Sequence, residues 1–216
     1  MGRLARLAAA AGAGYLAGAI PSADLAVRLA APPGTDLRTT GSGNPGAANA
    51  VKVIGPVWGY GIMAADIAKG ATACLAGRAL AGAGGSHLAG TAAVVGHCYP
   101  VWNGFRGGKG VAASVGQCLA TFPVYTPVDL AVAWVTSASP RWKQRSYGAA
   151  AVASACWVAA ATLWWRRRWP NLWGPAPTAA LPLAAVATSA VILHRFATVP
   201  LLTEDGPVTE KVIDAS

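Results

Sequence analysis

Apolar and polar residues are arranged along this chain in long blocks. Blocks rich in Ala, Gly, Val and Leu alternate with short segments that carry most of the charges. The apolar blocks span residues 7–29, 58–81, 88–101, 111–124, 128–138, 147–165 and 176–193. A helix needs about 20 apolar residues to cross a bilayer, and repeated apolar blocks with charged connections are typical of polytopic membrane proteins. The pattern predicts an all-α, integral membrane helical bundle with about seven transmembrane helices.

The number of crossings depends on how the shorter blocks are divided. The fourth and fifth blocks are separated only by Phe122–Pro123 and Thr126–Pro127, which predict either a tight turn or a kink within one long helix. Five or six helices are therefore alternatives to seven. Residues 1–203 are expected to form a single transmembrane domain, and residues 204–216 a short polar C-terminal tail.

The first apolar block is expected to be a membrane anchor. Arg3 and Arg6 precede an apolar stretch that is longer than a cleavable signal. Within this stretch, Gly14 and Gly18 lie one helical turn apart, so they would let a neighbouring helix approach closely, as compact membrane bundles require.

Composition supports the membrane class and indicates anionic partners. The chain is 54% hydrophobic and only 12% charged, whereas soluble domains are roughly 25% charged. Sixteen of the 17 Lys and Arg residues, but only four of the eight acidic residues, precede residue 204. This excess suits membrane lipids with anionic head groups and an anionic substrate. The basic residues are divided among short loops, which argues against nucleic acid, and the four cysteines show no metal-binding or disulfide spacing.

The distribution of basic residues also predicts an orientation. With the N-terminus outside, most basic loop residues fall on the cytoplasmic side, as the positive-inside rule requires. These residues are Arg28, Arg38, Lys52, Arg106, Lys109, Arg141, Lys143, Arg145 and Arg195. Arg3, Arg6 and Arg166–Arg168 fall on the outer side and do not follow the rule. We predict a multi-pass protein of the cell membrane with its site on the cytoplasmic face.

A cationic glycine-rich loop follows the third apolar block. Residues 97–110 read His-Cys-Tyr-Pro-Val-Trp-Asn-Gly-Phe-Arg-Gly-Gly-Lys-Gly. Glycines leave backbone N–H groups free to point at an anion, and Arg106 and Lys109 add charge. Gly110 stands where a Walker A loop needs Ser or Thr, so the loop is not of that kind. The candidate phosphate ligands are Arg106, Gly107, Gly108, Lys109 and Gly110, and a flexible basic turn is the alternative.

A second polar glycine-rich loop lies earlier in the chain. Residues 41–49 read Gly-Ser-Gly-Asn-Pro-Gly-Ala-Ala-Asn, and Arg38 precedes them. The hydroxyl and amide groups suit substrate positioning, with capping of the next helix as the alternative. We expect the two loops to meet on one face of the bundle and to form a pocket for anionic reactants. The candidates here are Arg38, Ser42, Gly43, Asn44, Gly46 and Asn49.

Ionisable residues also lie within or beside the apolar blocks. Asp66 and Lys69 are three residues apart on one helix face, where such costly side chains are usually paired. We expect an ion pair between them, with ligand contact by Lys69 as the alternative. His97 lies at the mouth of the cationic loop and His194 ends the last apolar block, and an imidazole at either position is a candidate proton carrier.

Three segments resemble the signatures of the membrane glycerol-3-phosphate acyltransferases of the PlsY type. Residues 36–49 are similar to the first signature and residues 96–112 to the second, while Asp66-x-x-Lys69-Gly70 resembles a further element. The third signature is altered. His194 and Arg195 match it, but the family's Asn, Arg and final Glu fall on Ala197, Pro200 and Gly206.

The resemblance implies an inner-membrane enzyme that transfers a fatty acyl group from acyl phosphate to the sn-1 hydroxyl of glycerol 3-phosphate. The products would be lysophosphatidic acid and phosphate, in phospholipid synthesis, with no cofactor or metal. Acyl phosphate has a good leaving group, so positioning and charge stabilisation can replace a protein nucleophile. On this interpretation Arg38, Ser42, His97 and His194 are catalytic candidates, and Lys69 joins the two loops in substrate binding.

Two other functions are compatible with the sequence. The altered third signature is compatible with a catalytically impaired paralogue that binds lipid or phosphate metabolites. An intramembrane pair such as Asp66 and Lys69 is also compatible with a small-anion transporter. The sequence leaves the oligomeric state, the acyl-chain preference and the general base open.

Overall fold

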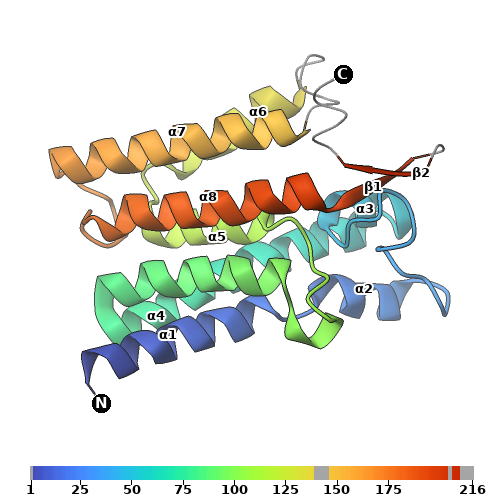
Figure 1. Ribbon diagram of the computed structural model, residues 1–216, viewed down its shortest axis with the longest axis horizontal. Coiled ribbons are helices and arrows are strands. Elements are labelled where there is room, and N and C mark those ends of the chain that lie inside the picture. The colour runs from blue at the N-terminus through green and yellow to red at the C-terminus, as the bar shows by residue number, and fades with distance from the viewer. Residues whose placement is uncertain (1, 139–145, 204–205, 210–216) are drawn as a thin grey trace.

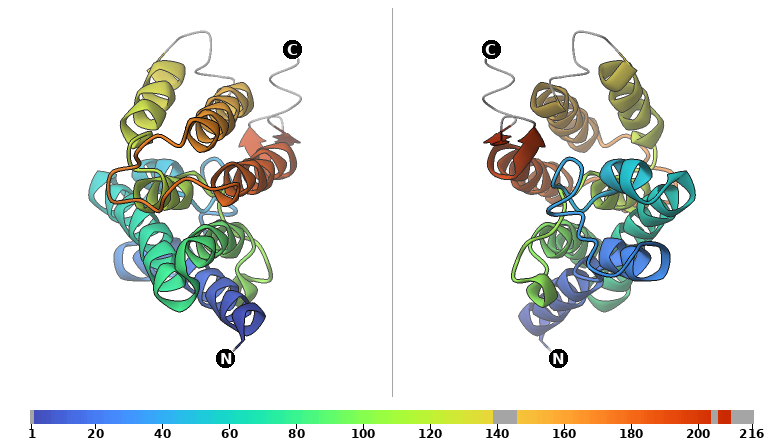
Figure 2. Two further views of the ribbon diagram at one scale, coloured as in Figure 1. Left: turned by 90° about the vertical axis from the view of Figure 1, so that its left-hand side faces the viewer. Right: turned by 90° about the vertical axis from the view of Figure 1, so that its right-hand side faces the viewer.

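The computed structural model of this chain describes residues 2–138, 146–203 and 206–209. Long helices run side by side along the molecule (Figure 1), which confirms the all-helical prediction. The helices are α1 (Arg3–Gly18), α2 (Ser22–Ala30), α3 (Ala47–Val53), α4 (Pro56–Cys98), η1 (Val101–Asn103), α5 (Val111–Thr121), α6 (Thr126–Ala138), α7 (Ser146–Arg167) and α8 (Ala180–Thr198). End-on views show α1 and α4 on one side, α6 and α7 on the other, and α5 and α8 between them (Figure 2). Arg141, Lys143 and Arg145 lie outside the described residues.

Each of the seven predicted apolar blocks contains helical structure. The first block contains α1 and α2, which are separated by a break at residues 19–21. Helix α4 supplies the second and third blocks, because helical geometry is lost at Ala81 and Gly82, where Gly82 has a φ of 66°. A Cβ on Gly77 would overlap the carbonyl oxygen of Gly85. The two halves of α4 therefore fold back on each other at a contact that only glycine allows.

The fourth and fifth blocks are separate helices. Phe122 leaves the helical region with a φ of −142°, and the Tyr125 N–H donates to its carbonyl oxygen at 3.0 Å before α6 begins. Pro123 lacks the N–H group that would continue α5. The turn prediction is therefore confirmed, and the alternative of a single kinked helix is wrong.

The bundle has an outer surface suited to lipid. The segments Arg3–Ala30, Tyr147–Arg167 and Ala180–Thr198 are long and apolar enough to cross a membrane by length and composition. Large apolar side chains are exposed on the outside of the bundle, including Trp134 at 71% and Leu183 at 66%. Such a surface is unfavourable in water and favourable in a hydrocarbon environment.

Small residues bring α1 and α4 together, as the spacing of Gly14 and Gly18 predicts. A Cβ on Gly14 would overlap the backbone of Ala89, and a Cβ on Gly18 would overlap that of Ala93. The two backbones are therefore in direct contact, which is how membrane helices gain packing energy without a hydrophobic driving force. This contact places the break between α1 and α2 beside the end of α4.

A short hairpin follows α8 that the sequence analysis did not anticipate. Strands β1 (Pro200–Thr203) and β2 (Gly206–Thr209) pair antiparallel, with Pro200 opposite Thr209 and Thr203 opposite Gly206. The hairpin crosses the expected boundary at residue 203. Two of the altered positions in the third signature, Pro200 and Gly206, therefore lie on paired strands.

Candidate active site

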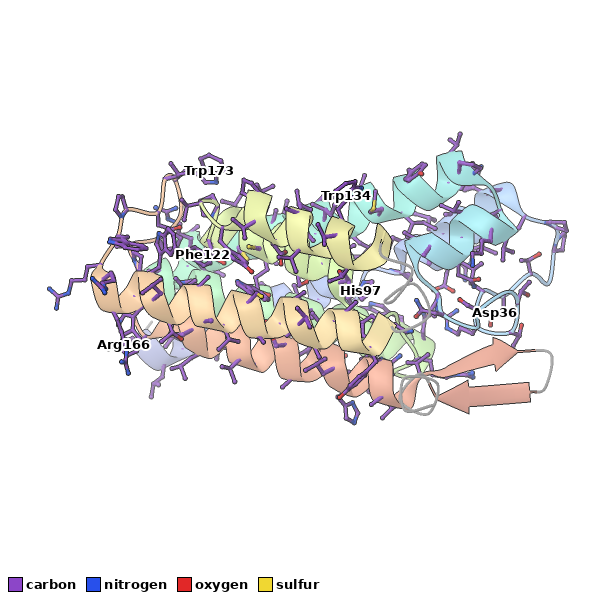
Figure 3. All side chains as sticks on the ribbon, turned by 90° about the horizontal axis from the view of Figure 1, so that it is seen from above. Asp36, His97, Phe122, Trp134, Arg166 and Trp173 are labelled. Carbon is purple, nitrogen blue, oxygen red and sulfur yellow. The ribbon has the colours of Figure 1, made fainter. Side chains whose placement is uncertain are left out.

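The two glycine-rich loops meet at one end of the bundle. The first loop comprises residues 31–46 and the second loop residues 99–110. The Arg38 Nε–H donates to the carbonyl oxygen of Arg106 at 2.9 Å and so joins them. A cavity at this junction is lined by residues of both loops, of the break between α1 and α2, and of α4. Asp36 of the first loop lies at the end of the molecule opposite Arg166 (Figure 3). The predicted convergence of the loops is confirmed.

Asn49 of α3 determines the shape of the first loop. Its Oδ1 accepts the Ser42 N–H at 2.8 Å, and its Nδ2 donates to the carbonyl oxygens of Leu37 and Thr40 at 3.0 and 2.9 Å. The side chain is 2% exposed. Its hydrogen-bonding groups are thus directed to the loop backbone, so Asn49 organises the loop and does not line the cavity.

The second loop is held by the end of α4 and by α8. The N–H groups of Gly107 and Gly108 donate to the carbonyl oxygens of Cys98 and His97 at 3.1 and 3.2 Å. The expectation that these two N–H groups are free for an anion is therefore wrong, because they satisfy carbonyl groups at the end of α4. Arg195 donates to the carbonyl oxygens of Gly107 at 2.6 Å and Gly108 at 3.2 Å.

Arg38 is the centre of an ionic cluster at the cavity. Its Nη1 lies 2.6 Å from Asp24 Oδ1 and 3.1 Å from Asp36 Oδ1, and its Nη2 lies 3.0 Å from Asp24 Oδ2. Asn103 Nδ2 donates to Asp24 Oδ2 at 2.6 Å. The hydrogen bond that Arg38 donates to the Asp24 carboxylate is the main cause that raises the pKa of Arg38, whose charge is therefore fixed. This cluster joins α2, the first loop and η1.

A second buried network forms the floor of the cavity. Lys69 Nζ lies 2.8 Å from Asp66 Oδ1, which confirms the predicted ion pair, and Ser22 Oγ donates to the same oxygen at 2.5 Å. Lys69 also donates to the Ile20 carbonyl oxygen at 3.1 Å, a group that the helix break leaves without its usual partner. His97 Nδ1 lies 3.7 Å from Asp66 Oδ1. Lys69 and His97 both line the cavity.

The structure does not bring every predicted residue to this cavity. His194 is exposed, with its Nδ1 2.7 Å from the Tyr99 hydroxyl oxygen, and Lys109 Nζ lies 4.4 Å from the centre of the Phe196 ring. The predicted residues that line the cavity are Arg38, Lys69, His97, Gly107 and Gly108. Those that do not are Ser42, Gly43, Asn44, Gly46, Asn49, Arg106, Lys109, Gly110 and His194.

Sequence reasoning missed several residues that build the site. Ser22, Asp24 and Asn103 line the cavity, and Arg195 anchors the second loop. Pro21 followed by two polar residues within an apolar block was a signal for Ser22 and Asp24. Only the fold connects Asn103 to Asp24 and Arg195 to the second loop.

Comparison with known proteins agrees with this arrangement. The glycerol-3-phosphate acyltransferase family matches residues 8–203. A glycerol-3-phosphate acyltransferase of Symbiobacterium thermophilum is 40% identical over 139 residues, which are 64% of this chain and 68% of that protein. Another, of Jannaschia sp., is 36% identical over 183 residues, which are 84% of this chain and 82% of that protein.

Two crystal structures of PlsY, an integral membrane glycerol 3-phosphate acyltransferase, have the same fold. The glycerol 3-phosphate form has a TM-score of 0.70 and 27% identity, and the match covers 88% of this chain and 87% of that one. The lysophosphatidic acid form has a TM-score of 0.68 and 24% identity over the same shares, and supports the fold alone. The match over residues 8–203 and the shared architecture show that this chain belongs to the family of integral membrane glycerol-3-phosphate acyltransferases.

Proposed function

We propose that this chain transfers a fatty acyl group from an acyl phosphate to the sn-1 hydroxyl of glycerol 3-phosphate. The hydroxyl oxygen attacks the acyl carbon, the bond from that carbon to the phosphate oxygen breaks, and the hydroxyl proton leaves with the inorganic phosphate. Lysophosphatidic acid is the other product. The PlsY structure with glycerol 3-phosphate supports this acceptor.

The observation that carries the proposal is the shared cavity of the two loops. Arg38 reaches it from the first loop, and Lys69 and His97 reach it from the two halves of α4. Cations placed where phosphate charge accumulates stabilise a transition state without moving during the reaction. Lys69 and His97 are proposed to contact the phosphate groups. Ser42 and Asn44, on the same loop as Arg38, are proposed to orient the acceptor.

The proposed location of the site is the cytoplasmic face of the cell membrane. Arg28, Arg38, Arg106 and Arg195 belong to the end of the bundle that carries both loops, and the positive-inside rule supports an inner location for that end. The test is a Lys52→Cys variant in the Cys156→Ser background. A membrane-impermeant thiol reagent should label it in inverted vesicles only, and labelling in right-side-out vesicles would contradict the orientation.

The function is tested with purified protein, acyl phosphate and glycerol 3-phosphate. We expect lysophosphatidic acid and inorganic phosphate to form in equal amounts. Lys69→Ala and His97→Ala, which both line the cavity, should each slow turnover by about a hundredfold, the effect of removing one transition-state donor. Lys52→Ala, an exposed change on α3, is the matched control. Binding of glycerol 3-phosphate without turnover would indicate an impaired paralogue. Uptake of glycerol 3-phosphate into proteoliposomes without turnover would indicate a transporter.

A further inference from the structure

Asp24 lies where two cavities meet. A second cavity opens beside the one between the loops, and Pro21, Asp24, Arg38 and Asn103 line both. Arg28, one turn further along α2, lines only the second cavity. The bond between Asp24 and Arg38 therefore forms part of the wall between the two spaces, and a change of partner by Asp24 would alter both.

Arg38 has little capacity left for a ligand. A guanidinium has five N–H groups, and here Nε–H donates to Arg106, both Nη1–H groups to Asp24 and Asp36, and one Nη2–H group to Asp24. Among the described residues, one N–H group of Arg38 has no acceptor. The charge of Arg38 is already shared by two carboxylates, so it attracts a phosphate less than an unpaired arginine would. Arg38 can form a bidentate contact with a phosphate only after a carboxylate leaves.

Asp24 has an alternative partner on its own helix. Arg28 follows it by four residues, a spacing that places the two side chains next to each other on α2. Arg28 is exposed, and its guanidinium makes no hydrogen bond or ion pair among residues 2–138. The Asp24 side chain is 26% exposed and faces both cavities. The i, i+4 spacing therefore lets side-chain rotation bring the carboxylate from Arg38 to Arg28.

We propose that Asp24 is an exchangeable counter-ion of Arg38. It pairs with Arg38 in this structure, and it passes to Arg28 when the phosphate of glycerol 3-phosphate takes its place at Arg38. This inference rests on the proposed function, because it requires a phosphorylated acceptor in the cavity. The exchange leaves both arginines and both anions paired, so no isolated charge is created. It also makes Asp24 a specificity residue, since a neutral polyol cannot displace a carboxylate.

The first test is Asp24→Asn in the purified full-length protein, with glycerol 3-phosphate binding measured at equilibrium without acyl phosphate. Asn keeps the size and one oxygen acceptor for Asn103 but removes the competing charge. We expect about tenfold tighter binding, as for loss of one competing charged hydrogen bond. KM for glycerol 3-phosphate should fall by the same factor. Unchanged or weaker binding in a folded variant would overturn the proposal and leave Asp24 as a support for Arg38.

Asp129→Asn is the matched control, because it removes a half-buried carboxylate on α6 that lies outside the residues lining both cavities. Its binding of glycerol 3-phosphate should equal that of the parent protein. An equal gain in both variants would mean that net charge alone is responsible, and would also overturn the exchange.

Arg28→Gln supplies the second test, in the opposite direction. Without its alternative partner, Asp24 competes more strongly, so binding of glycerol 3-phosphate should weaken about fivefold. In the Asp24→Asn background the same change should have no effect. An equal loss in both backgrounds would show direct attraction of phosphate by Arg28 and would refute the exchange. If Asp24→Asn does not fold, unchanged binding in Arg28→Gln alone refutes it.

These binding measurements separate the two proposals. A protein that shows the expected pattern but makes no lysophosphatidic acid would contradict the proposed function and support the exchange. A protein that makes lysophosphatidic acid, and in which Asp24→Asn binds glycerol 3-phosphate as the parent does, would support the proposed function and contradict the exchange.

Discussion

Arg195 provides a direct test of how α8 supports the site. It donates to the carbonyl oxygens of Gly107 at 2.6 Å and Gly108 at 3.2 Å, and its guanidinium carbon lies 4.9 Å from the centre of the Tyr99 ring. These contacts fix the second loop to the last helix. Arg195→Gln removes the charge and shortens the side chain, so we expect the loop to lose this anchor while the apolar face of α8 stays packed.

The cost can be worked from the three contacts. A hydrogen bond from a charged donor contributes about 1.5 to 3 kcal/mol, and the half-buried setting places the shorter bond near the lower value. The longer bond and the ring contact each contribute about 0.5 kcal/mol. The total is about 2.5 kcal/mol, which corresponds to a fall in kcat/KM of roughly 70-fold if the loop must be ordered in the transition state.

The assay is lysophosphatidic acid formation by purified variants, with thermal unfolding measured in the same detergent. Thr198→Ala is the control, because this exposed residue lies one turn further along α8 and its hydroxyl bonds only the His194 carbonyl oxygen among described residues. Arg195→Lys should be intermediate, since an ammonium group lacks the planar fork that reaches two carbonyl groups. A folded Arg195→Gln enzyme with kcat/KM within threefold of the parent would refute this role.

Two further predictions concern packing and loop order. Gly18→Ala should lower the free energy of unfolding by about 1 to 3 kcal/mol, because its Cβ meets the Ala93 backbone. Gly12→Ala on the same helix, where a Cβ would meet nothing within 4 Å, should be neutral or slightly stabilising. Equal unfolding temperatures for the Gly18→Ala and Gly12→Ala variants would contradict the packing argument. Asn49→Asp keeps the acceptor for the Ser42 N–H but loses the donors to Leu37 and Thr40. It should lower the unfolding temperature and weaken glycerol 3-phosphate binding, with Lys52→Gln on the same helix as control; binding equal to the parent's would show that loop order does not limit the site.

The sequence by itself determined the helical segments and the two loops. Long apolar blocks are expected to lie in lipid or in a packed interior, where no water can bond the backbone N–H and C=O groups. A helix supplies partners for these groups within one segment. The spacing of Gly14 and Gly18 indicated a close helix contact, and Asp66 with Lys69 indicated an ion pair, because both are short-range patterns on one helix face. The two loops could be located from the sequence because each is a contiguous glycine-rich segment.

Only the tertiary structure decided which polar groups share the cavity. Arg38 meets Asp24 across 14 positions, Asn103 meets Asp24 across 79, and Arg195 meets Gly107 across 88. It also directed the N–H groups of Gly107 and Gly108 to the end of α4, and placed His194 and Lys109 outside the cavity. Apolar periodicity records which face of a helix is buried, but a hydrogen-bond partner depends on the relative position of separate helices. That position is set by contacts between helix backbones, such as Gly14 against Ala89, and not by the polar groups themselves.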